Sequence, residues 1–192
     1  GLGKELSLKL LSSGQTVLGL SRKSIDSVEL KELIINKNFV YNECDIAKDN
    51  DVSRFVRNIK EQNFPIDVVI LNASLMQNDM INKEFDYVKF KEIVDVNLFG
   101  AVKIISYLLP LFQQRGKGIF IGISSLASQR GIVVNKIAYP VSKAALNMTF
   151  EAFRLQLANS NIRFITVNLG PLYEKGGILS VSYKQAAKKI VS

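Results

Sequence analysis

The chain of 192 residues is 47% hydrophobic and 22% charged, which is typical of one globular domain with a single core. It contains no histidine, which excludes Ser-His-Asp and Cys-His catalysis and argues against a catalytic zinc site. The net charge of +8 comes from scattered basic residues without a nucleic-acid-binding motif, so we expect no nucleic-acid partner.

Two features bear on the compartment. The single cysteine, Cys44, excludes an intramolecular disulfide and fits a reducing cytoplasm. The first residues do not resemble a signal peptide, and Lys103 and Pro110 interrupt the most apolar stretch, 102–112. We therefore expect a cytoplasmic protein without a membrane span.

Apolar strands alternate with amphipathic helices along the chain. In order, we predict helix 3–13, strand 16–20, helix 27–35, strand 39–41, helix 49–62, strand 67–71, a long helix within 85–112, strand 118–123, helix 139–158, strand 163–168 and helix 183–191. Such alternation predicts an α/β fold in which helices cover both faces of a parallel sheet. We expect one three-layer α/β/α domain over residues 1–192.

A hydroxyl pair and a tyrosine-lysine pair indicate proton transfer. Ser124 and Ser125 close an apolar strand, and Tyr139 precedes Lys143 by one helical turn. A phenol titrates near pH 10, and burial raises its pKa further, so work near neutral pH requires a fixed cation such as Lys143. Pro140 fits the first helical position, which would place Tyr139 at the positive end of the helix dipole.

The same spacing occurs a second time, between Tyr87 and Lys91. That pair lies in a charged stretch without a preceding hydroxyl-capped strand, so we interpret it as a solvated helical turn. Ligands of open α/β sheets bind beyond the carboxyl ends of the strands, where Asn72, Ser125 and Gly170 are predicted to lie. This context favours the Tyr139/Lys143 pair.

Several motifs in one order resemble the short-chain dehydrogenase/reductase family, which has a Rossmann-type doubly wound fold and a nicotinamide cofactor. Gly1-Leu2-Gly3 resembles the end of its glycine-rich fingerprint, and Leu71-Asn72-Ala73-Ser74 resembles its Asn-Asn-Ala-Gly segment. The family's four catalytic positions match Asn97, Ser125, Tyr139 and Lys143. The resemblance covers essentially the whole chain.

The resemblance implies a role for each catalytic position. Tyr139 would exchange a proton with the substrate oxygen during hydride transfer, and Ser125 would hydrogen-bond that oxygen. Lys143 would lower the pKa of Tyr139 and bind the nicotinamide ribose, and Asn97 would hold a water connecting Lys143 to solvent. The expected reaction is the interconversion of a small-molecule carbonyl and a secondary alcohol.

Further positions concern the cofactor. Ser21-Arg22 follows the predicted strand 16–20, where a guanidinium can pair with the 2′-phosphate of NADP, so we expect NADP rather than NAD. The other cofactor-binding positions implied by the resemblance are Gly1, Leu2, Gly3, Asp45, Ile46, Asn72, Ala73, Tyr139, Lys143, Gly170, Pro171 and Leu172. No metal is expected.

The sequence departs from the family pattern at three places. Tyr139 lies fourteen positions after Ser125, one more than usual, so Ser124 remains a reserve candidate. Asn168-Leu169-Gly170-Pro171 lacks the usual first proline, and an abrupt Glu174-Lys175-Gly176-Gly177 suggests an omission. The fold also requires a first strand before Gly1 and a last strand beyond Ser192, which we expect to be missing from the chain.

Two predicted helices are apolar almost all round. They carry, respectively, Leu98, Phe99, Ala101, Val102, Ile104, Ile105, Leu108 and Leu109, and Val141, Ala144, Ala145, Leu146, Met148, Phe150 and Phe153. Such an excess predicts a homodimer or homotetramer formed through these helices, with a deeper monomer core as the alternative.

Two other function classes remain open. One is a non-catalytic nucleotide-binding sensor or scaffold of the same fold, and the other is a nucleic-acid-binding domain with salt-dependent affinity. The matched set of Asn97, Ser125, Tyr139 and Lys143 favours the enzyme over both.

Overall fold

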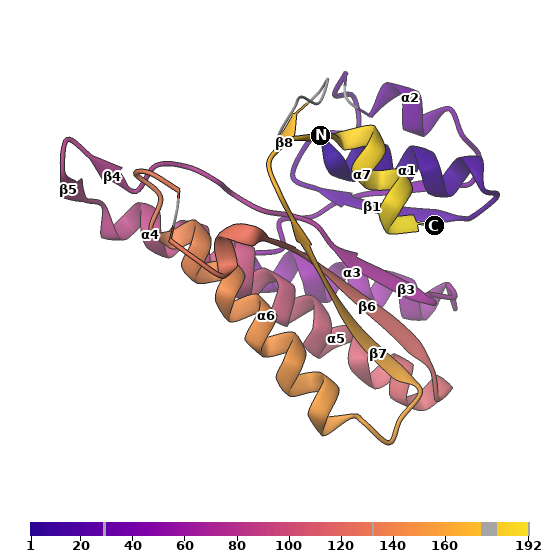
Figure 1. The fold of residues 1–192 in the computed structure, drawn as a ribbon. Coiled ribbons are helices and arrows are strands. Elements are labelled where there is room, and N and C mark those ends of the chain that lie inside the picture. Colours follow the sequence, from indigo (N-terminus) through magenta and orange to yellow (C-terminus); the bar gives the residue numbers. More distant parts are fainter. Residues whose placement is uncertain (29, 132, 174–179, 192) are drawn as a thin grey trace. The chain divides into compact units, whose positions relative to one another are not determined.

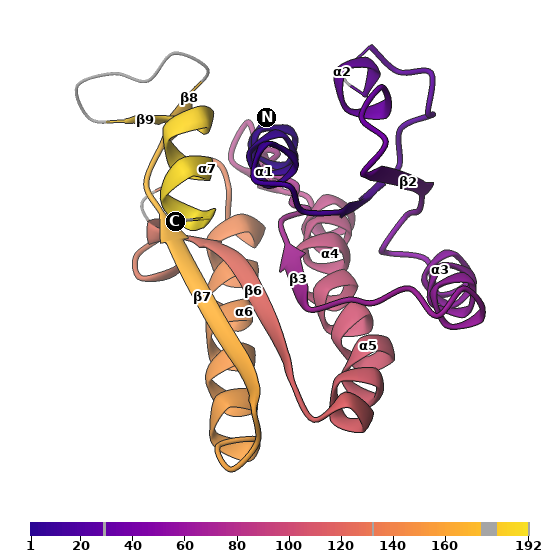
Figure 2. The same ribbon diagram turned by 90° about the vertical axis from the view of Figure 1, so that its right-hand side faces the viewer.

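The computed structural model describes residues 1–28, 30–131, 133–173 and 180–191. Contacts within the chain divide it into two compact units. The first unit comprises Gly1–Asp45 and Gly170–Ser192, and the second comprises Ile46–Leu169. Figures 1 and 2 show the elements of both units in two views.

The first unit is built on a pair of parallel strands. Its elements are α1 (Leu2–Ser12), β1 (Val17–Ser21), α2 (Lys31–Ile34), β2 (Phe39–Glu43), β8 (Leu172–Tyr173), β9 (Val181–Ser182) and α7 (Tyr183–Val191). β1 and β2 pair in register from Val17 opposite Phe39 to Ser21 opposite Glu43. β8 and β9 form a second short parallel pair, and α1 packs against α7.

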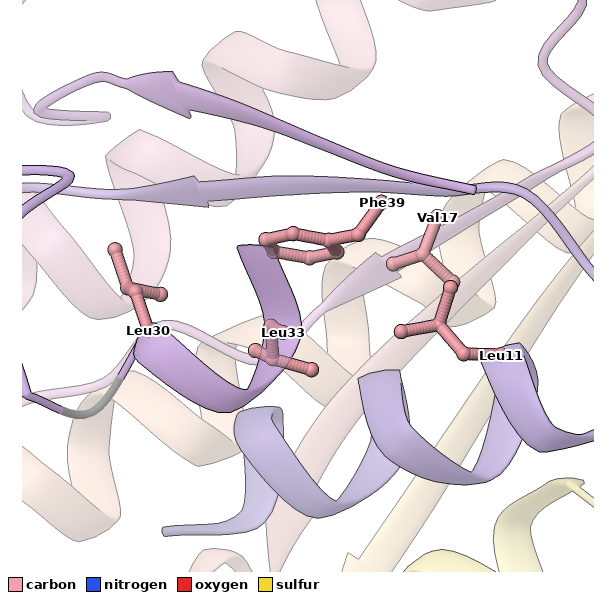
Figure 3. Close-up of a cluster of buried hydrophobic side chains, with 5 residues drawn as sticks. All are labelled: Leu11, Val17, Leu30, Leu33 and Phe39. Atoms are coloured by element: carbon pink, nitrogen blue, oxygen red, sulfur yellow. The ribbon is translucent and has the colours of Figure 1, made fainter. Parts of the chain in front are cut away.

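A cluster of buried side chains packs α1 and α2 against β1 and β2 (Figure 3). Its members are Leu11, Val17, Leu30, Leu33 and Phe39. The ring of Phe39 lies only 2.6 Å from where a Cβ of Gly19 would be, so a side chain at Gly19 would collide with this core. Glycine in the middle of β1 is therefore explained by close packing.

α2 is shorter than predicted. The sequence predicts a helix over 27–35, but α2 spans Lys31–Ile34 and turns precede it. The Oγ of Ser24 accepts a hydrogen bond from the Asp26 backbone N–H at 3.4 Å, and Ser27 N–H donates to the Ser24 carbonyl. The helix therefore begins four residues later than predicted.

The second unit contains a three-stranded parallel sheet with its helices. Its elements are α3 (Asp49–Glu61), β3 (Val68–Leu71), β4 (Met80–Ile81), β5 (Glu84–Phe85), α4 (Tyr87–Val94), the π-helix η1 (Asp95–Gly100), α5 (Ala101–Arg115), β6 (Gly118–Ser125), the 3₁₀-helix η2 (Leu126–Ser128), α6 (Ala138–Gln156) and β7 (Ile162–Leu169). The strand order is β3-β6-β7, with β6 in the centre. β4 and β5 form a short antiparallel hairpin.

α5 and α6 cover the same face of this sheet (Figure 2). Gly118 and Gly122, four residues apart on β6, present the same face, because side-chain direction alternates along a strand. Phe112 of α5 fills the space beside Gly118, and Phe150 of α6 fills the space beside Gly122. Phe120, fully buried between the two glycines, stacks on Phe164 of β7 with ring centroids 4.9 Å apart. The glycines thus let two large helical side chains reach the strand.

A helical run of 29 residues, Tyr87–Arg115, passes through α4, η1 and α5. This agrees with the long helix predicted within 85–112, and Lys103 and Pro110 lie inside the run. Pro110 is exposed, where water can satisfy the carbonyl it leaves unbonded, and Lys103 Nζ donates to the Ala47 carbonyl at 2.8 Å. The run is long and apolar enough to cross a membrane by length and composition. Its buried side chains, such as Ile105 and Phe112, are those of a core helix.

The strand pairs of the described residues bear on the predicted missing first strand. In the described ranges, β1 is hydrogen-bonded to β2 alone and β3 to β6 alone. Neither the missing strand nor the single domain over 1–192 is tested by this arrangement, and both stay predictions.

Candidate active site

The carboxyl ends of the strands in the second unit carry the predicted polar residues. The β6–β7 register places Ser124 opposite Asn168 and Ser125 opposite Leu169. Asn72 follows β3, whose last residue, Leu71, pairs with Gly122. Because parallel strands end at one edge, these groups lie along the same edge of the sheet.

Lys143 is the central charged group of this edge. Its side chain is only 2% exposed, and Nζ donates a hydrogen bond of 2.8 Å to the Ile123 carbonyl of β6. Burial lowers the pKa of Lys143 from the ordinary 10.5 to about 8. Ser124 Oγ of β6 also donates to the Lys143 carbonyl at 3.3 Å, so two hydrogen bonds connect α6 to β6 at this point.

Tyr139 is half-buried in the first turn of α6 and lies beside the Lys143 ammonium. Nζ is 5.9 Å from the centroid of the Tyr139 ring, within the range of a cation–π interaction. No hydrogen bond involves the Tyr139 hydroxyl in the part of the chain that the structure describes. The hydroxyl is thus available to a bound molecule.

The helix start differs from the prediction. Pro140 was expected at the first helical position, but α6 begins at Ala138, so Pro140 is the third residue and Tyr139 the second. The first four N–H groups of a helix have no partner within the helix, so a proline is tolerated there as well. Tyr139 remains within the turn where the helix dipole is positive.

Ser125 and Ser124 use their hydroxyls differently. Ser125 Oγ accepts a hydrogen bond of 3.1 Å from the Ala127 N–H, which leaves its own proton free to be donated. Ser128 Oγ donates to the Ser125 carbonyl at 2.6 Å. Ser124 is 3% exposed and already donates to Lys143. Of the two serines, Ser125 is the better placed to contact a ligand.

Asn97 lies inside the π-helix η1, a distortion often found at functional sites. Its Oδ1 accepts from the Leu75 N–H at 2.6 Å, and its Nδ2 donates to the Leu75 carbonyl at 2.9 Å and to Ser142 Oγ at 3.0 Å. Ser142 in turn donates to the Tyr139 carbonyl at 2.8 Å. Asn97 therefore connects the segment after β3 to the Tyr139 turn.

Sequence reasoning missed two buried polar residues of this site. Ser142, three residues after Tyr139, could have been found from its helical spacing. Asp79 is fully buried, and its carboxyl oxygens accept from the N–H groups of Ile137 at 2.7 Å and Ala138 at 2.5 Å. Nothing local marks Asp79 in the sequence, because its partners lie 58 and 59 residues away.

In the first unit, the predicted cofactor positions lie at element ends. Gly1, Leu2 and Gly3 form the start of α1, where helix N–H groups favour anions. Arg22 is exposed just after β1. The hydroxyl of Tyr41 on β2 donates toward the carbonyls of Ser21 and Lys23, which holds the backbone on both sides of Arg22.

The remaining predicted positions lie near strand ends of one unit or the other. Asp45 and Ile46 follow β2, and Ile46 packs on Gly100, 2.8 Å from where a Cβ would be. Asn72 is half-buried and Ala73 exposed after β3. Gly170 and Pro171 are exposed after β7, and Leu172 begins β8. The segment from Glu174 to Gly177 lies outside the described residues.

Comparison with known proteins places these features in a family. The family model of the short chain dehydrogenases matches residues 1–175. The chain is 29% identical to ketoacyl reductase HetN of Nostoc sp. over 76% of this chain and 50% of that protein. It is 26% identical to human retinol dehydrogenase 8 over 90% of this chain and 56% of that protein. The chain thus spans about half the length of these relatives.

Solved structures show the same fold. The closed form of serine dehydrogenase complexed with NADP⁺ superposes with a TM-score of 0.88 at 17% identity, over 100% of this chain and 84% of that one. The predicted α/β Rossmann-type fold is therefore confirmed. Because a family model covers nearly the whole sequence and the fold agrees, the chain belongs to the short-chain dehydrogenase family of oxidoreductases.

Proposed function

We propose that the protein is an NADP-dependent oxidoreductase that interconverts a small-molecule carbonyl and a secondary alcohol. The observation that carries this proposal is the buried Lys143, whose ammonium lies over the ring of Tyr139 at the carboxyl end of β6. Burying an ammonium costs stability, so its presence in the core points to a functional use. The arrangement places a fixed cation beside a phenol.

Each residue of the site has a separate role in the proposed reaction. Tyr139 donates a proton to the carbonyl oxygen during reduction and accepts it during oxidation. Ser125, whose hydroxyl proton is free, hydrogen-bonds the same oxygen and orients the substrate. Asn97 and Ser142 hold the Tyr139 turn in place. The nicotinamide cofactor supplies the hydride, and Lys143 would bind its ribose, as the family implies.

The experiment that tests this function is a titration with NADPH and NADH, followed by a carbonyl panel in which cofactor oxidation is monitored at 340 nm. The panel includes acyl-thioester ketones, retinoid aldehydes and small aldehydes, because relatives include a ketoacyl reductase and a retinol dehydrogenase. Cofactor-dependent reduction supports the proposal. Cofactor binding without turnover of any carbonyl would instead support a nucleotide-binding sensor.

The preference for NADP is assigned to Arg22, which is exposed after β1 and flanked by backbone that Tyr41 holds. We expect Arg22→Ala to weaken NADPH binding by about 10- to 100-fold, the value of a charged hydrogen bond, with NADH binding unchanged. Fluorescence titration measures both. The control is Lys37→Ala, which removes an exposed positive charge before β2, at the opposite end of the β1–β2 pair. Tighter binding of NADH than NADPH by the wild type would contradict this assignment.

A homo-oligomer formed through α5 and α6 is also proposed. Part of the predicted apolar excess is buried in the core, but Val141, Met148 and Leu155 are 47%, 65% and 71% exposed. Their spacing of seven residues places them on one stripe of α6. Beside the stripe, an open apolar groove of about 450 Å³ is lined by Leu109 and residues of α6. A second copy would cover this surface.

We expect Met148→Lys to convert the oligomer to a single chain, because it places a charge in the centre of this stripe. Light scattering coupled to size exclusion measures the mass. Val88→Lys is the control, since Val88 is 76% exposed on α4 and does not line the groove. An unchanged mass for Met148→Lys, or a monomeric wild type, would place the interface elsewhere. The cytoplasmic location stays a prediction.

A further inference from the structure

Asp79 is a fully buried acidic side chain of the second unit, and its partners lie at the start of the active-site helix. One carboxyl oxygen accepts from the Ile137 N–H at 2.7 Å and the other from the Ala138 N–H at 2.5 Å. The residue at the N-cap of α6 is Ile137, whose side chain cannot accept a hydrogen bond. Asp79 therefore supplies the cap that the helix itself lacks.

The backbone reinforces this connection. The N–H groups of Asp79 and Met80 donate to the Asn135 carbonyl at 3.0 and 3.3 Å. Asn135 has a φ of 59°, the left-handed conformation that asparagine tolerates better than most residues. Four hydrogen bonds thus join the segment at Asp79 to the loop that leads into α6.

We propose that Asp79 is a positioning residue for Tyr139, an inference that rests on the proposed function. Tyr139 is the second residue of α6, in the turn that frays most readily when it is not capped. A carboxylate at this end also has a favourable interaction with the helix dipole. Asp79 fixes the backbone before Tyr139, and Ser142 fixes the Tyr139 carbonyl from the other side. The two contacts hold the phenol where the substrate oxygen binds.

The chemistry of the cap requires a carboxylate. Each oxygen meets one backbone N–H, and a carboxylate is acceptor-only on both oxygens. Asparagine has the same shape but turns one acceptor into a donor, so one N–H would face an NH₂ group. Asp79→Asn therefore loosens the first turn without leaving a large cavity.

The matched control is Asp86→Asn. Asp86 is also a helix-capping aspartate, with Oδ1 accepting from the Lys89 N–H at 2.9 Å, but it caps α4. We expect Asp79→Asn to lower kcat by at least about 10-fold, since misplacing a catalytic group by 1 Å costs up to about 100-fold. KM and the Kd for NADPH should change by less than about twofold, and Asp86→Asn should leave all three within about twofold of wild type. All variants are measured well below their melting temperatures.

A second readout does not depend on turnover. The ¹³Cζ resonance of Tyr139, in protein labelled at tyrosine and assigned by its absence in Tyr139→Phe, should shift or broaden in Asp79→Asn but not in Asp86→Asn. If no carbonyl is reduced by the wild type, the proposed function fails, but this comparison still decides the role of Asp79. An unchanged resonance, or an unchanged kcat, in Asp79→Asn overturns the inference. If that variant does not fold, Asp79→Ser, which keeps one acceptor, is measured with the same expectation.

Discussion

Tyr139→Phe is expected to lower kcat for carbonyl reduction by about 10²- to 10⁴-fold, the usual contribution of a general acid. The substitution removes only the hydroxyl, and that hydroxyl makes no hydrogen bond to the described residues, so folding should be unaffected. The ring beneath the Lys143 ammonium stays in place. Binding of NADPH should therefore change little. Stopped-flow or steady-state kinetics measure kcat, and fluorescence titration measures the cofactor Kd.

The control for this experiment is present in the chain. Tyr87 precedes Lys91 with the same spacing, but Tyr87 is 66% exposed and Lys91 pairs with Asp95 at 2.6 Å on the surface of α4. The hydrogen bond with Asp95 raises the pKa of Lys91, in contrast to the lowered pKa of the buried Lys143. Tyr87→Phe should retain full activity. Turnover by Tyr139→Phe close to that of wild type would remove Tyr139 from the reaction.

Lys143→Met is expected to abolish turnover and yet to stabilise the free protein at pH 7. Burial lowers the pKa of Lys143 from 10.5 to about 8, a difference that corresponds to about 3 kcal/mol at about 1.4 kcal/mol per pH unit. The lost hydrogen bond to the Ile123 carbonyl offsets about 1 kcal/mol of this gain. The net increase in the free energy of unfolding at pH 7 should be about 2 kcal/mol.

The destabilisation of the native protein by the buried Lys143 depends on pH. Because the native pKa lies below the unfolded value, the native protein binds fewer protons than the unfolded chain between about pH 8 and 10.5. The destabilisation by Lys143 is thus complete below pH 8 and is relieved as the pH rises towards 10.5. Urea denaturation at pH 7 and 9.5 should show the advantage of Lys143→Met shrinking. The control, Lys91→Met, removes an exposed lysine and should give no such trend. A Lys143→Met protein less stable than wild type at pH 7 would contradict this account of the buried ammonium.

Most elements of the fold could be predicted from local patterns. The alternation of apolar strands with amphipathic helices located β1, β3, β6, β7 and the helices α1, α3, α6 and α7 to within one or two residues. The prediction placed the start of α2 four residues too early. It also did not contain the π-helix around Asn97 or the hairpin β4–β5. A π-turn depends on tertiary packing, and two-residue strands are too short to produce a periodic signal.

The sequence by itself determined which residues are candidates for the chemistry. Ser125, Tyr139 and Lys143 are recognisable because strand ends and helical spacing bring them to one edge, and both patterns are local. Only the tertiary structure decided how those residues are held. Lys143 bonds to Ile123, 20 positions away, and Asp79 caps the start of α6, 59 positions away. No local pattern in the sequence predicts these contacts or the burial of Lys143. Side-chain type follows directly from the sequence, whereas burial and hydrogen-bond partners arise only when distant segments pack together.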